Sequence, residues 1–333
     1  MKNLSAANKL MIKIAETNKH LTPVTPDDLP LFQKFFQKEP HTYGNSWTYV
    51  TQGVYGIGPQ KLGYKYYDGK NLSMVCVYPK IEQPKINVFY WIRPMGPNIL
   101  DKILDISKEN LSDYKLPTYV KKIFKNQFDY LKKGGFTDTK NFPWHTLSPS
   151  EDDSHAEQIY DVNKTMRQLS IRSNTSSLKR LYNKIPKITE KYSISITDNN
   201  FQSKSWFVSR KFFHSEYIRS NKKNLSDEFD YYNMIFFNHR RKNLVRKIVL
   251  SNNLPVGFYV IEKQNELYSS IYALITLRDK LKFLVDYIFL SIIQNNNTRF
   301  LNSGGSEDEG IHYFKQKYYP EQVQQMYWTT NYA

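Results

Sequence analysis

The sequence is almost without cysteine: Cys76 is the single thiol among 333 residues. One cysteine excludes an intramolecular disulfide framework and any zinc or iron–sulfur site built from several thiolates. His214 and His239 have no cysteine partners, and no HExxH motif occurs, so we expect no metal site. The scarcity of cysteine fits a reducing compartment.

Long apolar runs are also missing. The most apolar stretch, residues 281–293, is interrupted by Lys282 and Asp286, and none approaches the roughly 20 apolar residues of a membrane-spanning helix. The first twenty residues contain Lys and Glu and lack the apolar core of a signal peptide. We therefore expect a cytoplasmic protein without a transmembrane segment.

Positive charge is what the sequence has in excess. Its 47 Lys and Arg outnumber 31 Asp and Glu, giving a formal net charge of +16. Residues 164–249 contain 19 basic and 6 acidic residues, a surplus of 13 positive charges (19 − 6). Residues 250–333 contain 7 basic and 8 acidic residues. A local positive field captures polyanions. The alternative is that a Lys-rich composition makes ordinary solvated faces basic.

The order of predicted elements indicates an α/β protein with mixed sheets. In the first half we expect a helix from about residue 25, a hairpin over 62–79, a strand over 85–94, and helices over 97–110 and 119–136. Gly134 and Gly135 would close the last of these helices.

The second half has a clearer order. We expect strands over 193–198, 244–252, 256–263 and 267–276, a helix over 278–294, a strand over 297–305, a helix over 306–320 and a strand over 324–330. A helix between two strands supplies the crossover that a parallel pair requires. A shorter version of this order occurs in residues 20–140, which indicates a structural duplication.

A segment rich in Pro, Ser and acidic residues separates the two halves. The predicted division is a first domain over 1–145, a linker over 146–163 and a second domain over 164–333.

The segment FLNSGGSEDEGIHYFKQKYYP, residues 300–320, carries a family resemblance. It resembles the C-terminal signature of the phosphatidylglycerol lysyltransferase C-terminal domain family and, more distantly, the Fem-type peptidoglycan aminoacyltransferases. The stretches TPDDLPLFQKFFQK and NSWTYVTQGVYGIG also resemble the opening of that family's first domain. The resemblance implies two tandem acetyltransferase-like (GNAT) domains.

The resemblance also implies an acyltransferase. It implies transfer of an acyl or aminoacyl group from an activated ester or thioester to an amine or hydroxyl. Better-known members take the aminoacyl group from a charged tRNA and deliver it to a lipid or to a cell-wall precursor. Acetyltransferases of this fold that use coenzyme A usually carry a glycine-rich turn before the long helix, whereas ALITLRDKLKF has no glycine there. We therefore expect an aminoacyl-tRNA donor and no tightly bound cofactor, with acyl-coenzyme A as the alternative donor. Arg278, just before this helix, is a candidate for substrate binding.

The candidate catalytic residues lie in the matching segment. Ester aminolysis needs a proton acceptor and positive charge or N–H groups facing the developing oxyanion. Lys315 is the candidate for the oxyanion, Glu307 and Glu309 for the proton or the acceptor ammonium, and Asn302 for a ligand contact at a strand end. Each also has a purely structural interpretation. Lys315 could be an exposed helical lysine, Glu307 and Glu309 could be favourable acids in the first turn of a helix, and Asn302 could stabilise a turn.

Two further groups are candidates for substrate binding. Gly304, Gly305 and Ser306 offer backbone N–H groups at the start of a helix, or form an ordinary turn. Arg240, Arg241 and Arg246 follow an aromatic-rich segment and could hold the phosphates of tRNA or another polyanion, or form a solvated basic turn. Besides the transferase, a non-catalytic RNA-binding or scaffold protein and a coenzyme A-dependent N-acyltransferase remain open.

Overall fold

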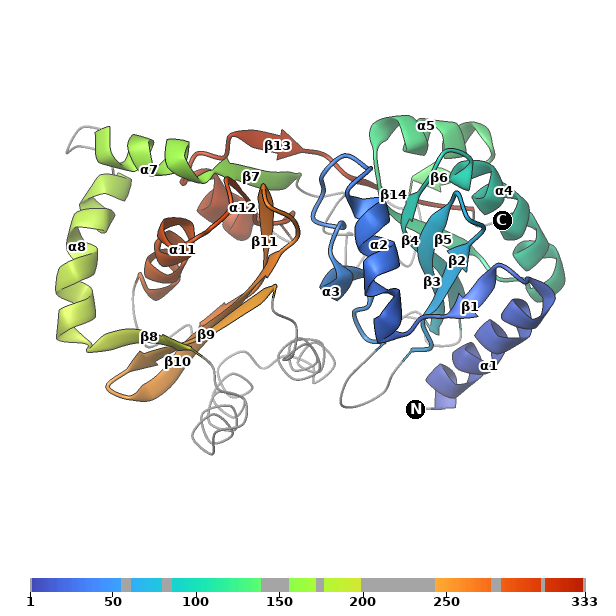
Figure 1. Cartoon of the computed structure of the whole chain (residues 1–333), viewed down its shortest axis with the longest axis horizontal. Helices are drawn as coiled ribbons and strands as arrows, with labels where there is room; N and C mark the ends of the chain where they lie inside the picture. The colour runs from blue at the N-terminus through green and yellow to red at the C-terminus, as the bar shows by residue number, and fades with distance from the viewer. Residues whose placement is uncertain are drawn as a thin grey trace. The chain divides into compact units, whose positions relative to one another are not determined.

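The chain forms two compact units, each built around one seven-stranded sheet (Figure 1). The computed structural model describes residues 2–54, 61–79, 86–138, 156–171, 177–198, 243–276, 283–306 and 309–331. Unit 1 contains Met1–Glu157, Gly305–Tyr313 and Val323–Ala333, and unit 2 contains Gln158–Gly304 and Phe314–Gln322. This division differs from the predicted one, because both units take segments from the end of the chain.

The sheet of unit 1 combines antiparallel and parallel pairs. Its strands, in spatial order, are β1 (Leu21–Pro23), β2 (Tyr64–Tyr67), β3 (Leu72–Pro79), β4 (Asn87–Met95), β5 (Thr118–Ile123), β14 (Tyr327–Thr330) and β6 (Thr137–Asp138). Only β4 and β5 run parallel among the pairs whose register is known, and the helix between them makes the crossover.

Helices supply apolar side chains to both faces of this sheet. They are α1 (Lys2–Thr17), η1 (Pro26–Asp28), α2 (Leu29–Phe36), α3 (Trp47–Val50), α4 (Ile99–Tyr114) and α5 (Lys125–Lys133). Strand β3 alternates between two apolar clusters: Val75 and Val77 join side chains of α1, α4 and α5, whereas Met74 and Cys76 join those of α2 and α3. Cys76 is therefore a core residue, as predicted.

The predicted helix over 119–136 is wrong in its first third. Residues Thr118–Ile123 form β5, and the helix begins only at Lys125. Five of the six β5 residues are buried between β4 and β14, so packing in the sheet overrides the helical pattern. The end of the helix is as predicted, because Gly134 caps α5 and Gly135 has a φ of 95°.

The sheet of unit 2 repeats this arrangement. Its strands, in spatial order, are β13 (Gln322–Gln324), β7 (Glu157–Asp161), β12 (Phe300–Asn302), β11 (Tyr268–Thr276), β10 (Leu254–Lys263), β9 (Leu244–Ser251) and β8 (Ile194–Asp198). Its helices are α7 (Val162–Ile171), α8 (Ser177–Lys191), α11 (Leu284–Gln294) and α12 (Glu309–Gln316). Strand β7 falls inside the predicted linker over 146–163, and all five of its residues are buried.

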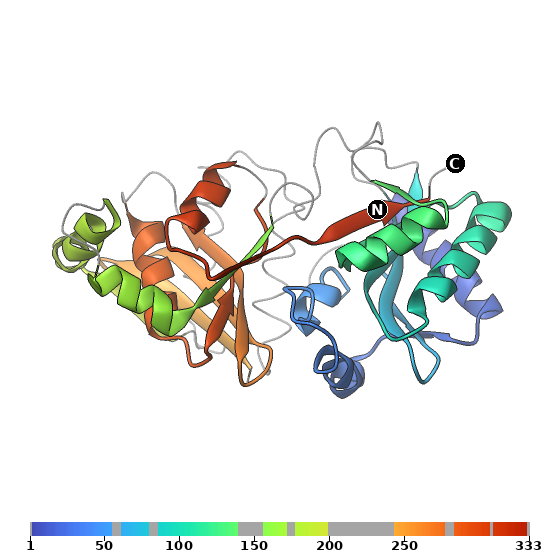
Figure 2. The ribbon, with the colours of Figure 1, turned by 90° about the horizontal axis from the view of Figure 1, so that it is seen from above.

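The two sheets have the same topology and exchange one strand. Reading both from their antiparallel edge, β1-β2-β3-β4-β5-β14-β6 corresponds to β8-β9-β10-β11-β12-β7-β13. The sixth position therefore holds β14 from the end of the chain in unit 1, and β7 from the middle of the chain in unit 2 (Figure 2). The predicted duplication is confirmed in topology, and the predicted strand near residue 327 belongs to the first sheet.

Each parallel pair separates next to a β-bulge. In unit 1 the pairing ends at Ile92 and Lys121, and Arg93 and Pro94 then stand opposite Ser73 alone. In unit 2 the parallel pairing ends at Ser270 and Asn302. The register between β10 and β11 then shifts by one residue between Ile271 and Ala273. Bulges re-aim side chains and are common beside active sites, so both positions are candidates for functional groups.

Among the described residues, no helix has the length and apolarity needed to cross a bilayer.

Candidate active site

The first candidate site lies in unit 2, at the point where β12 ends. Strand β12 pairs with only the first three residues of β11, which continues to Thr276. Ligand groups in mixed sheets collect where parallel strands separate at their carboxyl ends. The buried polar side chains at this end are those of Ser270 and Asn302, which face each other across the pair.

Hydrogen bonds from the N–H and to the carbonyl of Gly304 fix the turn after β12. The N–H of Gly304 donates to Oδ1 of Asn302 at 2.8 Å, and Nζ of Lys315 donates to the carbonyl of Gly304 at 3.3 Å. Gly304 has a φ of 71°, a conformation that glycine adopts without strain. Asn302 therefore stabilises the turn, which is the alternative to a ligand contact. Lys315 contacts the same turn.

Lys315 is not an exposed helical lysine, which was the alternative to a catalytic role. It lies in the last turn of α12, yet the residue is only 9% exposed. Its backbone carbonyl accepts a hydrogen bond from the Tyr160 hydroxyl at 3.0 Å, and burial raises the pKa of Tyr160. Lysine is rarely buried unless a partner or a function requires it, and the carbonyl of Gly304 is one such partner.

Ser270 is a further candidate for this site that the sequence did not indicate. Its hydroxyl is buried, and no partner for it is found in the described part of the chain. A buried hydroxyl without a partner needs an explanation such as water or a ligand. Nothing in the run LYSSIYALIT distinguishes Ser270 from Ser269, whose hydroxyl contacts Thr298.

The other predicted residues are distributed more widely. Arg246 lies on β9 opposite Val260, three strands from β12, so the structure does not bring it to Lys315. Gly305 and Ser306 belong to unit 1, where the Ser306 hydroxyl is buried and lacks a partner among the described residues. Glu309 begins α12, and its side chain is not described. Four predicted residues lie outside the described residues: Glu307, Arg278, Arg240 and Arg241.

The N-terminus of α11 already holds a negative charge. Asp286 lies in its first turn, is buried, and accepts hydrogen bonds from Lys317 and from the Tyr318 hydroxyl. Burial and the neighbouring Asp286 raise the pKa of Tyr318. The carboxylate occupies the end of the helix at which an anion would otherwise be stabilised.

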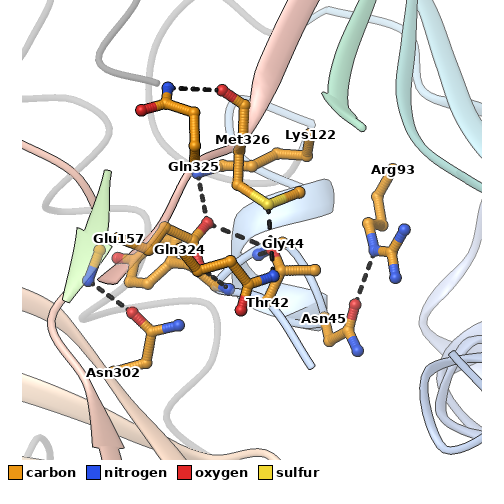
Figure 3. Close-up of polar contacts among 12 residues, drawn as sticks. Thr42, Gly44, Asn45, Arg93, Lys122, Glu157, Asn302, Gln324, Gln325 and Met326 are labelled. Carbon is orange, nitrogen blue, oxygen red and sulfur yellow. Dashed lines mark hydrogen bonds and ion pairs between the residues drawn. The ribbon is translucent and has the colours of Figure 1, made fainter. Parts of the chain in front are cut away.

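A second candidate site lies in unit 1 and consists of buried charges. Glu157 accepts hydrogen bonds from Lys122 Nζ at 2.9 Å, from the Thr42 hydroxyl at 3.2 Å and from the Tyr43 N–H at 2.7 Å (Figure 3). Both side chains of the Lys122–Glu157 pair are almost completely buried. Gln324 fixes the same loop by donating to the carbonyl of His41 at 3.1 Å.

Arg93 stands beside this pair at the separated end of β4 and is fully buried. Its Nε donates to Oδ1 of Asn45 at 2.7 Å, and one terminal nitrogen donates to the carbonyl of Pro40 at 3.2 Å. The Asn45 amide is oriented by its own donation to the carbonyls of Phe36 and Pro40. The sequence analysis did not single out Arg93, Lys122 or Glu157.

No group of three or more potential metal ligands occurs within the described ranges.

His41 makes the stability of unit 1 depend on pH. Burial, opposed by Glu157 and reinforced by Arg93, lowers its pKa from 6.5 to about 4. Between about pH 6.5 and 4 the unfolded chain binds a proton that the folded chain does not, so the free energy of unfolding falls as pH falls. At about 1.4 kcal/mol per unit, we expect a loss of roughly 3 kcal/mol that is complete below pH 4.

Urea unfolding of the chain and of His41→Asn at pH 7, 6, 5 and 4.5 measures this effect. The stability difference between the two proteins should shrink or reverse as the pH falls, because asparagine has no proton to bind. A difference that stays constant across this range would show that His41 is not buried in its neutral form.

Comparison with known proteins identifies the fold. No family model matches the chain. No curated protein matches its sequence.

Solved structures match it over most of its length. L-PGS from Bacillus licheniformis is 13% identical with a TM-score of 0.57, covering 93% of each chain. FemX is 12% identical with a TM-score of 0.58, covering 93% of this chain and 96% of its own. A tandem GNAT protein from the clavulanic acid biosynthesis pathway is 8% identical with a TM-score of 0.56, covering 93% and 97%.

These identities are low, so the matches concern the fold. All three extend over both units, and the two sheets are the mixed sheets that such a fold requires. The chain therefore has the tandem GNAT fold that it shares with L-PGS and FemX, as its C-terminal segment predicts.

Proposed function

We propose that the chain is an acyltransferase that moves an aminoacyl group from charged tRNA to an amine or hydroxyl acceptor. The observation that carries this proposal is the buried Lys315 at the separated end of β12, with Nζ 3.3 Å from the carbonyl of Gly304. The shared fold of L-PGS and FemX supports the class of reaction.

The choice of donor rests on the start of α11. A coenzyme A donor needs N–H groups and a positive helix end for its pyrophosphate. The stretch before α11 has no glycine, and the first turn of α11 already holds the buried Asp286 carboxylate with its partners Lys317 and Tyr318. An aminoacyl ester on tRNA places its phosphates elsewhere, where the basic surplus of residues 164–249 provides counter-charge.

In the proposed reaction the acceptor's nitrogen or oxygen forms a bond to the ester carbonyl carbon. The carbonyl oxygen then carries negative charge, and Lys315 Nζ stabilises it with a charge-assisted hydrogen bond. The bond to the terminal ribose oxygen breaks, and the proton lost by the acceptor passes to that oxygen. Ser270, whose partner across the strand pair is Asn302, is the candidate to orient the ester.

The test is Lys315→Ala in a single-turnover assay of aminoacyl transfer or deacylation from charged tRNA. We expect a loss of about 10²–10³-fold in rate, the effect of removing one oxyanion donor. The matched control is Lys133→Ala, because Lys133 also lies in the last turn of a helix, α5, but is exposed. The control should retain full activity, and thermal unfolding should show that both variants fold.

The possible outcomes separate the functions. Lys315→Ala activity within about threefold of the original chain would refute the assigned role of Lys315. Salt-sensitive tRNA binding without any turnover in the original chain would favour an RNA-binding protein. Turnover with acyl-coenzyme A but not with charged tRNA would favour the N-acyltransferase.

A further inference from the structure

Two cations occupy strained positions at the separated strand ends of unit 1. Arg93 and Lys122 directly follow the last paired residues of β4 and β5, with φ values of 53° and 60°. Left-handed conformations cost non-glycine residues about 1 kcal/mol or more and persist where surrounding structure or function requires them. Lys122 is explained by its ion pair with Glu157 at 2.9 Å, whereas the carboxylate nearest to Arg93 among the described residues, that of Glu39, is 3.9 Å away.

The hydrogen bonds of Arg93 leave one nitrogen unused. A guanidinium carries five N–H donors. Nε serves Asn45 and Nη2 serves the carbonyl of Pro40, whereas Nη1 has no partner in the described part of the structure although it is buried. Figure 3 shows Nε directed at Asn45 and the other two nitrogens directed away from it.

The charge of Arg93 is also incompletely matched. Its nearest carboxylate oxygen, on Glu39, lies 3.9 Å from Nη2, too far for a hydrogen bond, and the other Glu39 oxygen accepts the N–H of Gly96. Glu157 is engaged by Lys122 and the Thr42–Tyr43 loop. Burying a guanidinium against neutral oxygens is costly unless an anion completes the site.

The loop over this guanidinium is fitted closely to both cations. A Cβ at Gly44 would stand 3.1 Å from Lys122 Cβ and 3.3 Å from Arg93 Cδ. On the other side, the ring of Phe124 lies 5.3 Å from the guanidinium carbon. Arg93 is thereby fixed in direction by the loop and the ring, as a preorganised donor must be.

We propose that Nη1 of Arg93 binds a small oxyanion, a carboxylate or a phosphate, in unit 1. The site stands at the position in the first sheet that Ser270 and Asn302 occupy in the second. The anion accepts from Nη1 and supplies the negative charge that Glu39 and Glu157 do not bring within hydrogen-bonding distance of the guanidinium.

The experiment measures thermal unfolding of the full chain during titration with inorganic phosphate and, separately, with acetate. Ionic strength is held constant with chloride. Specific binding to the folded state raises the midpoint as the ligand concentration rises. Arg93→Lys keeps the charge but loses the fork of donors, and we expect at least tenfold weaker binding. The matched control, Arg299→Lys, changes an arginine that is 62% exposed and bound to Asp161, and should bind as the original chain does.

Stabilisation by phosphate alone or by acetate alone identifies the chemical source of the anion. Equal stabilisation of the original chain and Arg93→Lys would overturn the proposal, as would no stabilisation at all. If Arg93→Lys does not fold, a crystal of the original chain grown with selenate decides the matter. Anomalous density within hydrogen-bonding distance of Nη1 supports the site, and a water molecule or no density there refutes it.

Discussion

Glu157→Ala is expected to destabilise unit 1 by about 3–5 kcal/mol, because it leaves the buried ammonium of Lys122 without its counter-charge. The same change removes the acceptor of the Thr42 hydroxyl and the Tyr43 N–H. A loss of this size is a large share of the total stability of an ordinary domain. Urea unfolding, followed by the fluorescence of the chain's tryptophans, measures it.

Two further variants distinguish loss of charge pairing from loss of packing. Adding Lys122→Met to Glu157→Leu removes both charges, and we expect it to recover at least half of the lost stability, since apolar pairs often replace buried ion pairs at little cost. Asp129→Ala breaks the exposed pair of Lys125 and Asp129, at 60% and 47% exposure, and should cost at most about 0.5 kcal/mol. A double variant no more stable than Glu157→Ala would contradict this account.

Deleting residues 325–333 is expected to unfold the sheet of unit 1. The deletion removes β14, which pairs with both β5 and β6. It also removes the buried Met326 and the ring of Tyr327, which stacks on Phe128 at 5.0 Å. Two large apolar contacts and two rows of strand hydrogen bonds together contribute at least about 4 kcal/mol. Hydrogen exchange of the β5 amides should rise from protected to near the unfolded rate.

A peptide of residues 323–331 provides the control. Added in excess to the truncated chain, it should restore protection of the β5 amides, whereas a scrambled peptide of the same composition should not. Unchanged protection in the truncated chain would mean that β14 is not a structural strand of the first sheet.

Local patterns in the sequence predicted those elements whose partners are near in the chain. The hairpin of β9 and β10 follows from apolar runs around the turn at Asn252 and Asn253, both of which have positive φ. The β5 segment was predicted as the start of the helix that Gly134 and Gly135 close, and its burial between β4 and β14 makes it a strand instead. The partner of β14 could not be predicted, since a strand pattern does not specify its sheet.

The family resemblance singled out Lys315 as a candidate, and the structure places it against the turn after β12, where its role stays a prediction. The buried cluster of Arg93, Lys122 and Glu157 carries no local signal, because its members are far apart in the chain and resemble any surface charges. Ser270 became visible only when its hydroxyl was found buried without a partner among the described residues.

The strand exchange between the sheets also dictates the order of events during protein synthesis. Ile123 of β5 and Tyr327 of β14 are opposite each other in the sheet but 204 residues apart in the chain (327 − 123). At about 5–20 residues per second, a ribosome needs roughly 10–40 s to make that interval. The edge of β5 therefore remains uncovered throughout, open to pairing with other nascent chains. Unit 1 completes its sheet only after β14 has left the exit tunnel.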